Sequence, residues 1–523
     1  MILKILLAVS FVWAALIPCK RALHMFQQNR YEVKRYFKWM KESWILNASK
    51  AVLPLALCIV SLILGAVVKG TFGAVIPAVI MFCMGMMLWS EEKKKNYIKP
   101  LVYTARVKRQ IAVMCILAAV LLYVLLKTGV HFLMPLCAFL APWLLAYLMA
   151  WITIPVESMI RNRYINEARK ILADHKDLIR IGITGSFGKT STKNIMQSML
   201  SEQYNSLMTP ASYNTPLGIT RTIREMLKPI HKVFVCEMGA DHVGEITYLM
   251  NFVHPTIGLV TSIGPQHLNT FGSQENIIRE KMQMIELLPK DGFGILNYDN
   301  EFIRNYHIQN DVETVTYGIR HSDVDYHAED IVYSQTGSSF TVVHGDERVR
   351  IETKLLGELN ILNILSAIAC ARHLGVEWNV IQRAAKQMKQ VEHRLEMRNI
   401  NGYRFIDDAL NSNPTGSAMA LEVLSMMPNT RVVVTPGMID LGEKQAEYNK
   451  AFGEKMKDKA DIVILVGENQ TRPIYEGLEE SGFDMNNVHV MKTVKEAFAF
   501  VYQHCTPKDT ILLENDLPDA FSH

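Results

Sequence analysis

Five long apolar segments in the first 155 residues constrain the fold more than any other feature of the sequence. They cover about 2–18, 51–68, 72–90, 110–126 and 132–154. A helix needs roughly 20 mostly apolar residues to cross the hydrocarbon core of a bilayer, and each segment comes close to that length. We therefore expect a membrane domain of about five transmembrane helices over residues 1–160, with the lipid bilayer as a partner.

Basic residues are concentrated in two of the connections between these segments. One connection holds Lys20, Arg21, Arg30, Lys34, Arg35, Lys38, Lys41 and Lys50, and the other holds Lys93, Lys94, Lys95, Lys99, Arg106, Lys108 and Arg109. The other two connections are short, with one lysine each. Because strongly basic connections stay in the cytoplasm, we expect the N-terminus outside and everything after residue 155 in the cytoplasm. The predicted location is the cell membrane, crossed several times.

Two other interpretations apply to parts of this region. Residues 2–18 could be a cleaved signal peptide, but basic residues follow the segment more strongly than they precede it, and no small-residue cleavage site ends it. Residues 22–47 could form an amphipathic helix on the membrane surface, held by basic and aromatic side chains. Ordinary anchoring of the chain in the membrane explains residues 22–47 equally well.

Charge and cysteine content exclude several classes of function. The formal net charge of +4 is small for 523 residues, and the basic residues lie beside the apolar segments, so nucleic acid is not an expected partner. None of the eight cysteines forms a C-x-x-C pair, which argues against a disulfide framework and against a thiolate zinc site. A chain of this length is expected to fold as two to four domains.

A glycine-rich turn opens the soluble half of the chain. Residues 180–183 predict a short buried strand, and Thr-Gly-Ser-Phe-Gly-Lys-Thr at 184–190 leads into a helical pattern. The backbone N–H groups of such a turn and of the helix start converge on one point and bind phosphate. The glycines permit the tight backbone, Lys189 can reach the outer phosphates, and the Thr190 hydroxyl can ligate Mg²⁺. The general P-loop pattern would have glycine where Ile183 stands.

Further motifs follow this turn along the chain. They are Tyr-Asn-Thr-Pro-Leu-Gly at 213–218, Val-Cys-Glu-Met-Gly-Ala at 235–240, Gly-Glu-Ile at 244–246, Thr-Ser-Ile-Gly-Pro-Gln-His-Leu at 261–268, the region of Lys281, Leu-Asn-Tyr-Asp at 296–299, Gly-Glu-Leu-Asn-Ile-Leu-Asn at 357–363, His-Arg-Leu-Glu at 393–396 and Asp-Asp-Ala-Leu-Asn-Ser-Asn-Pro at 407–414. In this order, over about 170–450, they resemble the Mur ligase family. The most similar branch is the one that adds D-alanyl-D-alanine to a muramoyl tripeptide.

The resemblance implies a fold class: an α-helical membrane domain followed by α/β, with a P-loop central ATPase domain over 170–395 and a Rossmann-like C-terminal domain over 396–523. Apolar runs at 431–435, 461–467 and 509–514 alternate with helical patterns, which by itself favours such a C-terminal domain. Membrane segments stand where that branch has a domain for a soluble UDP-sugar precursor.

The resemblance also implies roles for individual residues. ATP binding falls to Thr184, Gly185, Ser186, Phe187, Gly188, Lys189, Thr190, Ser191, Asn360, Asn363, Arg394 and Asp408. Metal binding falls to Thr190, Glu237, His267 and Lys281, catalysis to Lys189, Lys281, His267 and Glu237, and substrate binding to Asn214, Asn411 and Asn413. Lys281 would be carbamoylated, which turns a cation into an anion beside Mg²⁺.

Elementary chemistry is compatible with these roles. Glu237 and His267 each close an apolar run, so both are expected at the carboxyl ends of strands, where α/β sheets bind ligands. Asn360 and Asn363 lie one helical turn apart and can face an adenine together. On residue type alone, the glutamate could instead cap a helix, and the histidine could be an ordinary satisfied polar side chain. Lys281 could likewise be an ordinary solvated lysine.

The implied activity is ATP-dependent, ADP-forming amide bond formation through an acyl phosphate, with ATP and Mg²⁺ as cofactors. The expected partners are a cell-wall precursor or membrane-associated wall glycopolymer and an amino acid or dipeptide. Because membrane segments replace the UDP-sugar domain, we hypothesise that the acceptor is lipid-linked.

Two positions depart from the family, and other functions remain open. Leu359 stands where the family usually has histidine, and residues 512–519 stand where the branch has Lys-Gly-Ser-Arg.

A membrane transporter or motor driven by a P-loop ATPase is one alternative, although the glutamate, histidine and lysine series favours a ligase. A non-catalytic scaffold and a folylpolyglutamate-synthase-like activity are the others.

Overall fold

The chain folds into two compact units. The computed structural model describes residues 1–48, 52–68, 71–95, 97, 100–334, 336–409, 413–439 and 441–515. Met1–Asn162 forms a helical unit, and the described residues from Arg163 onward form an α/β unit.

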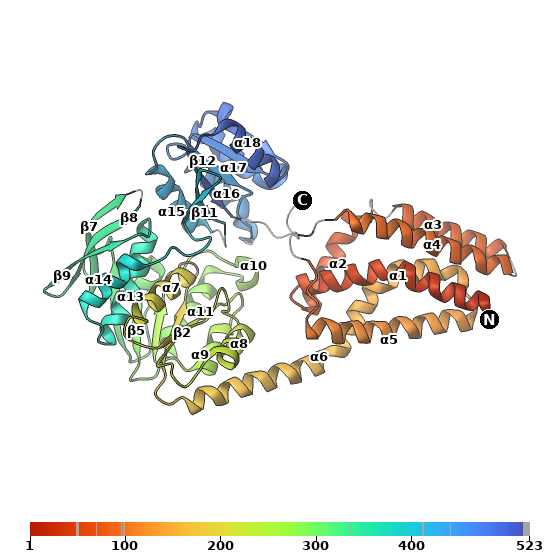
Figure 1. Ribbon diagram of the computed structural model, residues 1–523, viewed down its shortest axis with the longest axis horizontal. Helices are drawn as coiled ribbons and strands as arrows, with labels where there is room; N and C mark the ends of the chain where they lie inside the picture. The colour runs from red at the N-terminus through yellow and green to blue at the C-terminus, as the bar shows by residue number, and fades with distance from the viewer. Residues whose placement is uncertain are drawn as a thin grey trace. The chain divides into compact units, whose positions relative to one another are not determined.

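The helical unit is built from helices, most of them apolar in sequence (Figure 1). They are α1 (Ile2–Gln28), α2 (Val33–Ala48), α3 (Val52–Val67), α4 (Thr71–Lys93), α5 (Ala105–Thr128) and α6 (Met134–Asp174). Four of the five predicted segments form helices that are long and apolar enough to cross a membrane, at Ile2–Gln28, Gly73–Lys93, Ala105–Thr128 and His131–Asp174. Within the described residues, the remaining one, α3, has 16 residues and is shorter than these four. The orientation stays a prediction.

Small residues allow close packing inside this unit while its outside stays apolar. A methyl group added to Gly85 of α4 would lie 2.2 Å from the Trp13 ring of α1, so only glycine fits there. In contrast, Ile116, Val120 and Tyr123 of α5 are 63%, 56% and 62% exposed. An apolar outer face of this kind suits a lipid environment.

The α/β unit begins with a middle domain built on a nine-stranded sheet. Its strands are β1 (Ile179–Thr184), β2 (Ser206–Met208), β3 (Val233–Glu237), β4 (Ile257–Val260), β5 (Phe293–Asn297), β6 (Glu313–Gly318), β7 (Tyr326–Ser334), β8 (Gly337–His344) and β9 (Glu347–Thr353). The order is β2-β3-β1-β4-β5-β6-β7-β8-β9, and only the β7–β8 and β8–β9 pairs are antiparallel. The sheet is thus parallel where the predicted site residues lie.

Helices cover both faces of this sheet (Figure 1). They are α7 (Lys189–Leu200), α8 (Pro216–Met226), α9 (Glu245–Val253), α10 (Leu268–Phe271), α11 (Gln274–Glu286), α12 (Glu301–Arg304), α13 (Glu358–His373) and α14 (Trp378–Gln387). One core joins the sheet to α7, α13 and α14, and a second joins it to α8, α9, α11 and the end of α6. The predicted α/β class is confirmed.

The C-terminal domain has a six-stranded sheet in the order β10-β11-β15-β12-β13-β14, antiparallel only between β10 and β11. Its strands are β10 (Glu396–Ile400), β11 (Tyr403–Asp408), β12 (Arg431–Thr435), β13 (Ile462–Val466), β14 (Val488–Met491) and β15 (Thr510–Glu514). The helices are α15 (Pro414–Ser425), α16 (Gln445–Glu454), α17 (Glu468–Ser481) and α18 (Val494–His504). Alternation of parallel strands and helices gives the predicted Rossmann-like arrangement.

Sheet order decides where the site forms. Strands β3, β1 and β4 are neighbours and parallel, so their carboxyl ends lie at one edge of the sheet. The turn 184–190 leaves β1, Glu237 ends β3, and the segment that carries His267 leaves β4. Three motifs that are far apart in sequence therefore meet at this edge.

Candidate active site

Two glycines shape the turn between β1 and α7. Gly185 and Gly188 have φ of +149° and +83°, and added methyl groups would lie 2.1 Å from Thr261 Oγ1 and 2.9 Å from Asn363 Oδ1. Backbone conformation and space both select glycine at these positions. No side chain caps the start of α7, so its first N–H groups remain available to an anion. The turn therefore fits a phosphate group.

The segment after β4 supports the turn from one side. Ser186 N donates to Ser262 O at 2.7 Å, and Phe187 N donates to Ser262 Oγ at 3.0 Å. Ser186 Oγ donates to Gly264 O, and the Ser262 hydroxyl donates to Phe187 O, at 3.0 and 2.8 Å. Ser262 was not singled out from the sequence, although it belongs to one of the quoted motifs. It fixes the backbone that the phosphate loop presents.

Glu237 is the centre of a buried polar cluster at the end of β3. Its carboxylate accepts hydrogen bonds from Thr190 Oγ1 at 3.1 and 3.2 Å, from Asn214 Nδ2 at 2.9 Å and from Lys193 Nζ at 2.9 Å. The glutamate is 1% exposed. Burial would raise the pKa of Glu237, but Lys193 and Lys189 hold it below its ordinary value. The group is therefore an anion beside the Thr190 hydroxyl, and this pair fits a Mg²⁺ ion.

Lys193 is a second residue of the candidate site that the sequence analysis did not single out. Its side chain is fully buried and its ammonium group lies 2.9 Å from Glu237 Oε2. The residue lies one turn beyond Lys189 in α7, beside buried Thr192. A lysine in a helix gives no local signal that distinguishes a buried ion pair from a solvated side chain. Only the positions of its buried neighbours in α7 indicate that it faces inward.

The side chain of Lys189 folds back onto the glycine-rich turn that precedes α7. Its Nζ donates to Gly185 O at 2.5 Å and to Ser186 O at 3.2 Å. Burial, together with the charge of Arg394, lowers the pKa of Lys189 to about 8, against the opposing effect of Glu237. An ammonium group that is poorly solvated and close to a turn suited to phosphate gains strongly from a bound anion.

Lys281 of α11 is 1% exposed and donates from Nζ to Ala240 O at 3.1 Å. Burial and the charge of Lys189 lower its pKa to about 7, against the opposing carboxylates of Glu280, Glu245 and Asp241. Carbamoylation requires the neutral amine, and a lowered pKa supplies it near neutral pH. The residue thus fits the predicted modification, which stays a prediction.

The predicted adenine contacts differ in availability. Asn363 Oδ1 accepts from Thr192 Oγ1 at 3.0 Å, while its buried Nδ2 has no hydrogen-bond partner within the described part of the chain. Asn360 Nδ2 instead donates to Leu356 O, just before its own helix α13, at 2.8 Å. Of the two, Asn363 has the amide group that a ligand would satisfy.

Arg394 and Asp408 lie together in the C-terminal part of the site. Burial lowers the pKa of Arg394, with Asp408, Glu237 and Glu514 opposing. Burial raises the pKa of Asp408 to about 6, against the effect of Arg394. Leu395 N donates to Asp408 Oδ1 at 3.1 Å and fixes this carboxyl group.

The remaining predicted residues are placed as follows. Thr184 Oγ1 donates to Met238 O at 2.9 Å, and Ser191 is buried in the first turn of α7. His267 precedes α10 with φ of +54°. Asn413 Oδ1 accepts from Gly416 N at 3.0 Å and so caps α15, a structural role that the sequence analysis did not consider. Asn411 lies outside the described residues.

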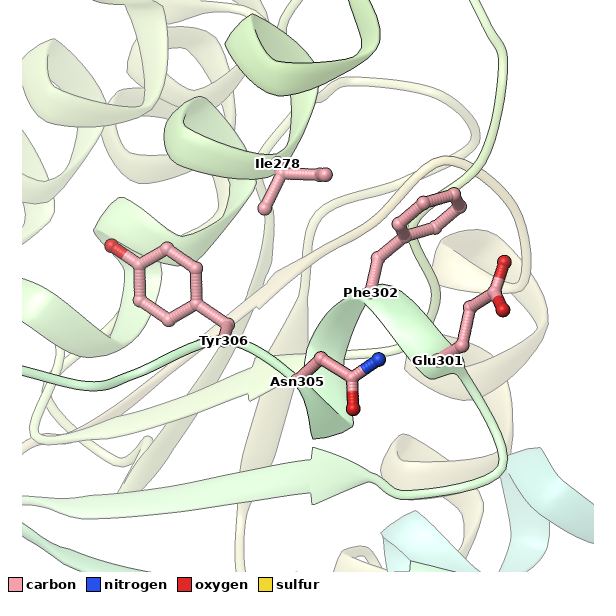
Figure 2. Close-up of a pocket in the computed structure, with 5 residues that line it drawn as sticks. All are labelled: Ile278, Glu301, Phe302, Asn305 and Tyr306. Atoms are coloured by element: carbon pink, nitrogen blue, oxygen red, sulfur yellow. The ribbon is translucent and has the colours of Figure 1, made fainter.

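A separate pocket of about 330 Å³ lies against α11 and α12. Figure 2 shows the residues that line it, which are Ile278, Glu301, Phe302, Asn305 and Tyr306. None of the predicted site residues lines this pocket. It therefore adds nothing to the site at the sheet edge.

Comparison with known protein families decides the classification. A model described as the Mur ligase middle domain matches residues 183–371, and a model described as the Mur ligase glutamate ligase domain matches residues 393–514. Both domains of the α/β unit belong to the Mur ligase family. The matched ranges contain every predicted site residue from Gly185 to Asn413.

Several curated relatives are UDP-N-acetylmuramoyl-tripeptide–D-alanyl-D-alanine ligases. The protein of Bacillus subtilis (strain 168) is 30% identical over 292 residues, which are 55% of this chain and 62% of that protein. The protein of Escherichia coli (strain K12) is 30% identical over 291 residues, which are 55% of this chain and 64% of that protein. The chain thus spans less than two thirds of the length of either relative.

Solved Mur ligases share the fold. A MurF crystal structure from Acinetobacter baumannii has a TM-score of 0.62 at 25% identity, with 69% of this chain and 78% of that chain covered. The MurF ligase of Thermotoga maritima in complex with ADP has a TM-score of 0.62 at 22% identity, with 68% and 80% covered. The Mur ligase prediction made from the motifs is confirmed.

Proposed function

We propose that this chain is an ATP-dependent, ADP-forming ligase that joins an amino acid or dipeptide to a cell-wall precursor. The observation that carries the proposal is the cluster of Thr190, Glu237, Asn214 and Lys193 beside the glycine turn. It combines a metal-binding carboxylate with a phosphate loop on a Mur ligase fold. A transporter or motor has no comparable use for a buried Lys281.

The reaction has two steps. A carboxylate oxygen of the acceptor attacks the γ-phosphorus of ATP, the bond to ADP breaks, and an acyl phosphate forms. The amine of the second substrate then attacks the acyl carbon, loses a proton and expels inorganic phosphate, which leaves an amide. No side-chain nucleophile is required.

The chain's own residues position and compensate charge in both steps. Lys189 faces the outer phosphates, and the N–H groups at the start of α7 bind their oxygens. Thr190, Glu237, His267 and carbamoylated Lys281 would hold Mg²⁺, which supplies Lewis acid stabilisation of the transferred phosphoryl group. Asn363 and Asp408 would orient the nucleoside, and Arg394 would bind its phosphates. Asn214, Asn411 and Asn413 would contact the substrates.

The acceptor is a lipid-linked precursor at the cytoplasmic face of the cell membrane. Helices long and apolar enough to cross a bilayer precede the ligase domains, and the basic connections 19–50 and 91–109 favour this orientation. A membrane anchor gives a lipid-linked substrate a high local concentration at the enzyme.

Phosphate release by the detergent-solubilised full chain tests the proposal. We expect release from ATP only when an acceptor and an amine are both present, with lipid-linked muramoyl tripeptide preferred over soluble UDP-muramoyl tripeptide when D-Ala-D-Ala is the amine. Equal activity on the two acceptors would contradict the proposal that the acceptor is lipid-linked. ATP hydrolysis that needs neither substrate would contradict the proposed ligase function.

A further inference from the structure

The polar end of the helical unit contains a cluster of charged side chains that membrane anchoring alone does not require. Glu157 of α6 accepts from Arg109 Nε and Nη2, both at 2.8 Å, and Arg106 Nε lies 3.9 Å from the same carboxylate. Two guanidinium groups thus lie close to one carboxylate. The side chains of Arg106 and Arg109 are 33% and 39% exposed. A ligand from outside can therefore approach both guanidinium groups.

An aromatic ring holds Arg106 in place. Its guanidinium carbon lies 4.0 Å from the ring centroid of Tyr31, and Tyr31 OH accepts from Gln27 Nε2 at 2.7 Å. Gln27 also exchanges two hydrogen bonds of 2.9 Å with the backbone of Val102. Arg106 Nε donates no hydrogen bond to any residue that the structure describes. The Arg106 guanidinium group is therefore held by stacking on the Tyr31 ring, while its Nε makes no hydrogen bond within the described residues.

Gln110 lies one turn deeper along α5 and is 1% exposed. Neither Nε2 nor Oε1 of its amide has a hydrogen-bond partner within the described ranges of the chain. Residues four apart on a helix lie on the same face, so this amide follows Arg106 into the bundle. Buried polar groups are almost always paired, and an amide with two unpaired ends indicates a missing ligand.

The chemistry of that ligand follows from these groups and from their place. Guanidinium forks select phosphate oxygens, and an amide can donate to an ester oxygen and accept from a hydroxyl. Arg109, Ile116, Val120 and Tyr123 share one face of α5, and the last three are more than half exposed. A lipid whose phosphate binds at the arginines can therefore place its alkyl chains along this apolar face.

We propose that Arg106, Arg109 and Gln110 form a binding site for the phosphate of a membrane lipid, and that this lipid carries the acceptor. The second clause rests on the proposed ligase function. The site is separate from the nucleotide site and requires none of its residues.

Binding to the delipidated full chain in detergent tests the site. The probes are dioleoyl phosphatidic acid, dioleoylglycerol with the same chains but no phosphate, and inorganic phosphate alone. We expect phosphatidic acid to bind at least about tenfold more tightly than either control, because a charge-assisted hydrogen bond is worth about a factor of ten. Equal binding of dioleoylglycerol, or of inorganic phosphate, would overturn the proposal.

Two variants and a matched control locate the site. Arg106→Gln and Gln110→Leu should each weaken phosphatidic acid binding by about tenfold. Lys127→Gln should leave it unchanged, because Lys127 also lies over a tyrosine ring, at 5.6 Å from that of Tyr123, but at the other end of α5. Equal weakening by Lys127→Gln, or wild-type binding in the two site variants, would refute the assignment. Arg106→Lys, which keeps the charge and loses the fork, should bind with intermediate affinity and serves if Arg106→Gln does not fold.

Gln110→Leu separates a binding role from a structural one. It removes an unpaired buried amide, so the lipid-free variant should melt at a higher temperature than the wild type while binding the lipid more weakly. A lower melting temperature would show that Gln110 is part of the packing, and would overturn its role as a ligand. Lys189→Ala should lower phosphate release by about 10²–10³ and leave lipid binding intact, so that failure of the ligase and failure of this site remain distinguishable.

Discussion

Two carboxylates in this molecule, Glu237 of the middle domain and Glu157 of the helical unit, each lie close to two cations. Glu237 is 1% exposed and its partner Lys193 is fully buried, while the arginines around Glu157 are one third exposed or more. Thr190 and Asn214 complete the hydrogen bonds of Glu237. The same charge pattern therefore serves a closed, fully paired centre in one unit and an open, partly paired one in the other.

Burial decides how much an ion pair contributes to the free energy of unfolding. Breaking a buried pair leaves a charge without solvent or partner and costs about 3–5 kcal/mol. An exposed pair exchanges one set of favourable contacts for water and contributes about 0–1 kcal/mol. Removing one member of each pair tests this distinction.

Lys193→Met should have the largest effect. It leaves the Glu237 carboxylate buried without its main partner, so the free energy of unfolding should fall by about 3–5 kcal/mol. Thermal unfolding of the purified chain measures the loss. The double variant with Glu237→Gln, which leaves no charge behind, should recover most of it. Wild-type stability of the single variant would show that water reaches Glu237.

Lys189→Ala tests a cation of the same centre that is placed for a ligand. Since a donor to developing negative charge is worth about 10²–10³ in rate, phosphate release should fall by that factor. Stability should not fall, because burial already disfavours the charged form and lowers the pKa of Lys189 to about 8. Turnover and melting temperature, measured on one preparation, distinguish this outcome from simple unfolding.

Glu157→Gln should have a much smaller effect than the change at Lys193. The side chains around Glu157 are partly exposed, so the free energy of unfolding should change by about 1 kcal/mol or less. Thermal unfolding in the same detergent allows direct comparison with Lys193→Met. A loss of similar size in both variants would remove the distinction between the two centres.

Asp461→Asn gives the smallest expected effect and a pH signature. Hydrogen bonding to Arg431 lowers the pKa of Asp461 below its ordinary value of 3.8. The stabilisation is therefore present above that value and disappears as pH falls through the lower folded value. The wild type should exceed the variant by less than about 1 kcal/mol at pH 7 and by nothing near pH 2. Melting curves across this range check the trend.

Local signals were sufficient for the phosphate loop and the strand ends. Gly185, Gly188 and Glu237 belong to patterns that depend on backbone geometry within a few residues, and the structure places them at one sheet edge. Lys193 depends on burial by elements far away in sequence, which no local pattern records. Asn413 is similar, because its side chain is committed to α15 in a way that its motif does not reveal.

Helix lengths in the first unit show the same limit. Apolar composition predicted segments that end near residues 18 and 154, yet α1 continues to Gln28 and α6 to Asp174. Ion pairs and protein contacts support the polar turns there, as between Lys20 and Glu92 at 2.8 Å. A hydropathy argument detects the part of a helix that meets lipid and not its polar extension.

The polar end of α6 has a practical consequence for anyone who wishes to study the ligase without its helices. Ile165, Ala168 and Leu172 are at most 4% exposed and belong to the core that α8, α9 and α11 share, and Glu167 pairs with Arg224 at 2.9 Å. A shortened chain that starts at residue 170, where the resemblance to the Mur ligase family suggested the domain begins, would uncover that core and aggregate. Starting before Tyr164 retains the cover, and soluble expression of the two versions should differ accordingly.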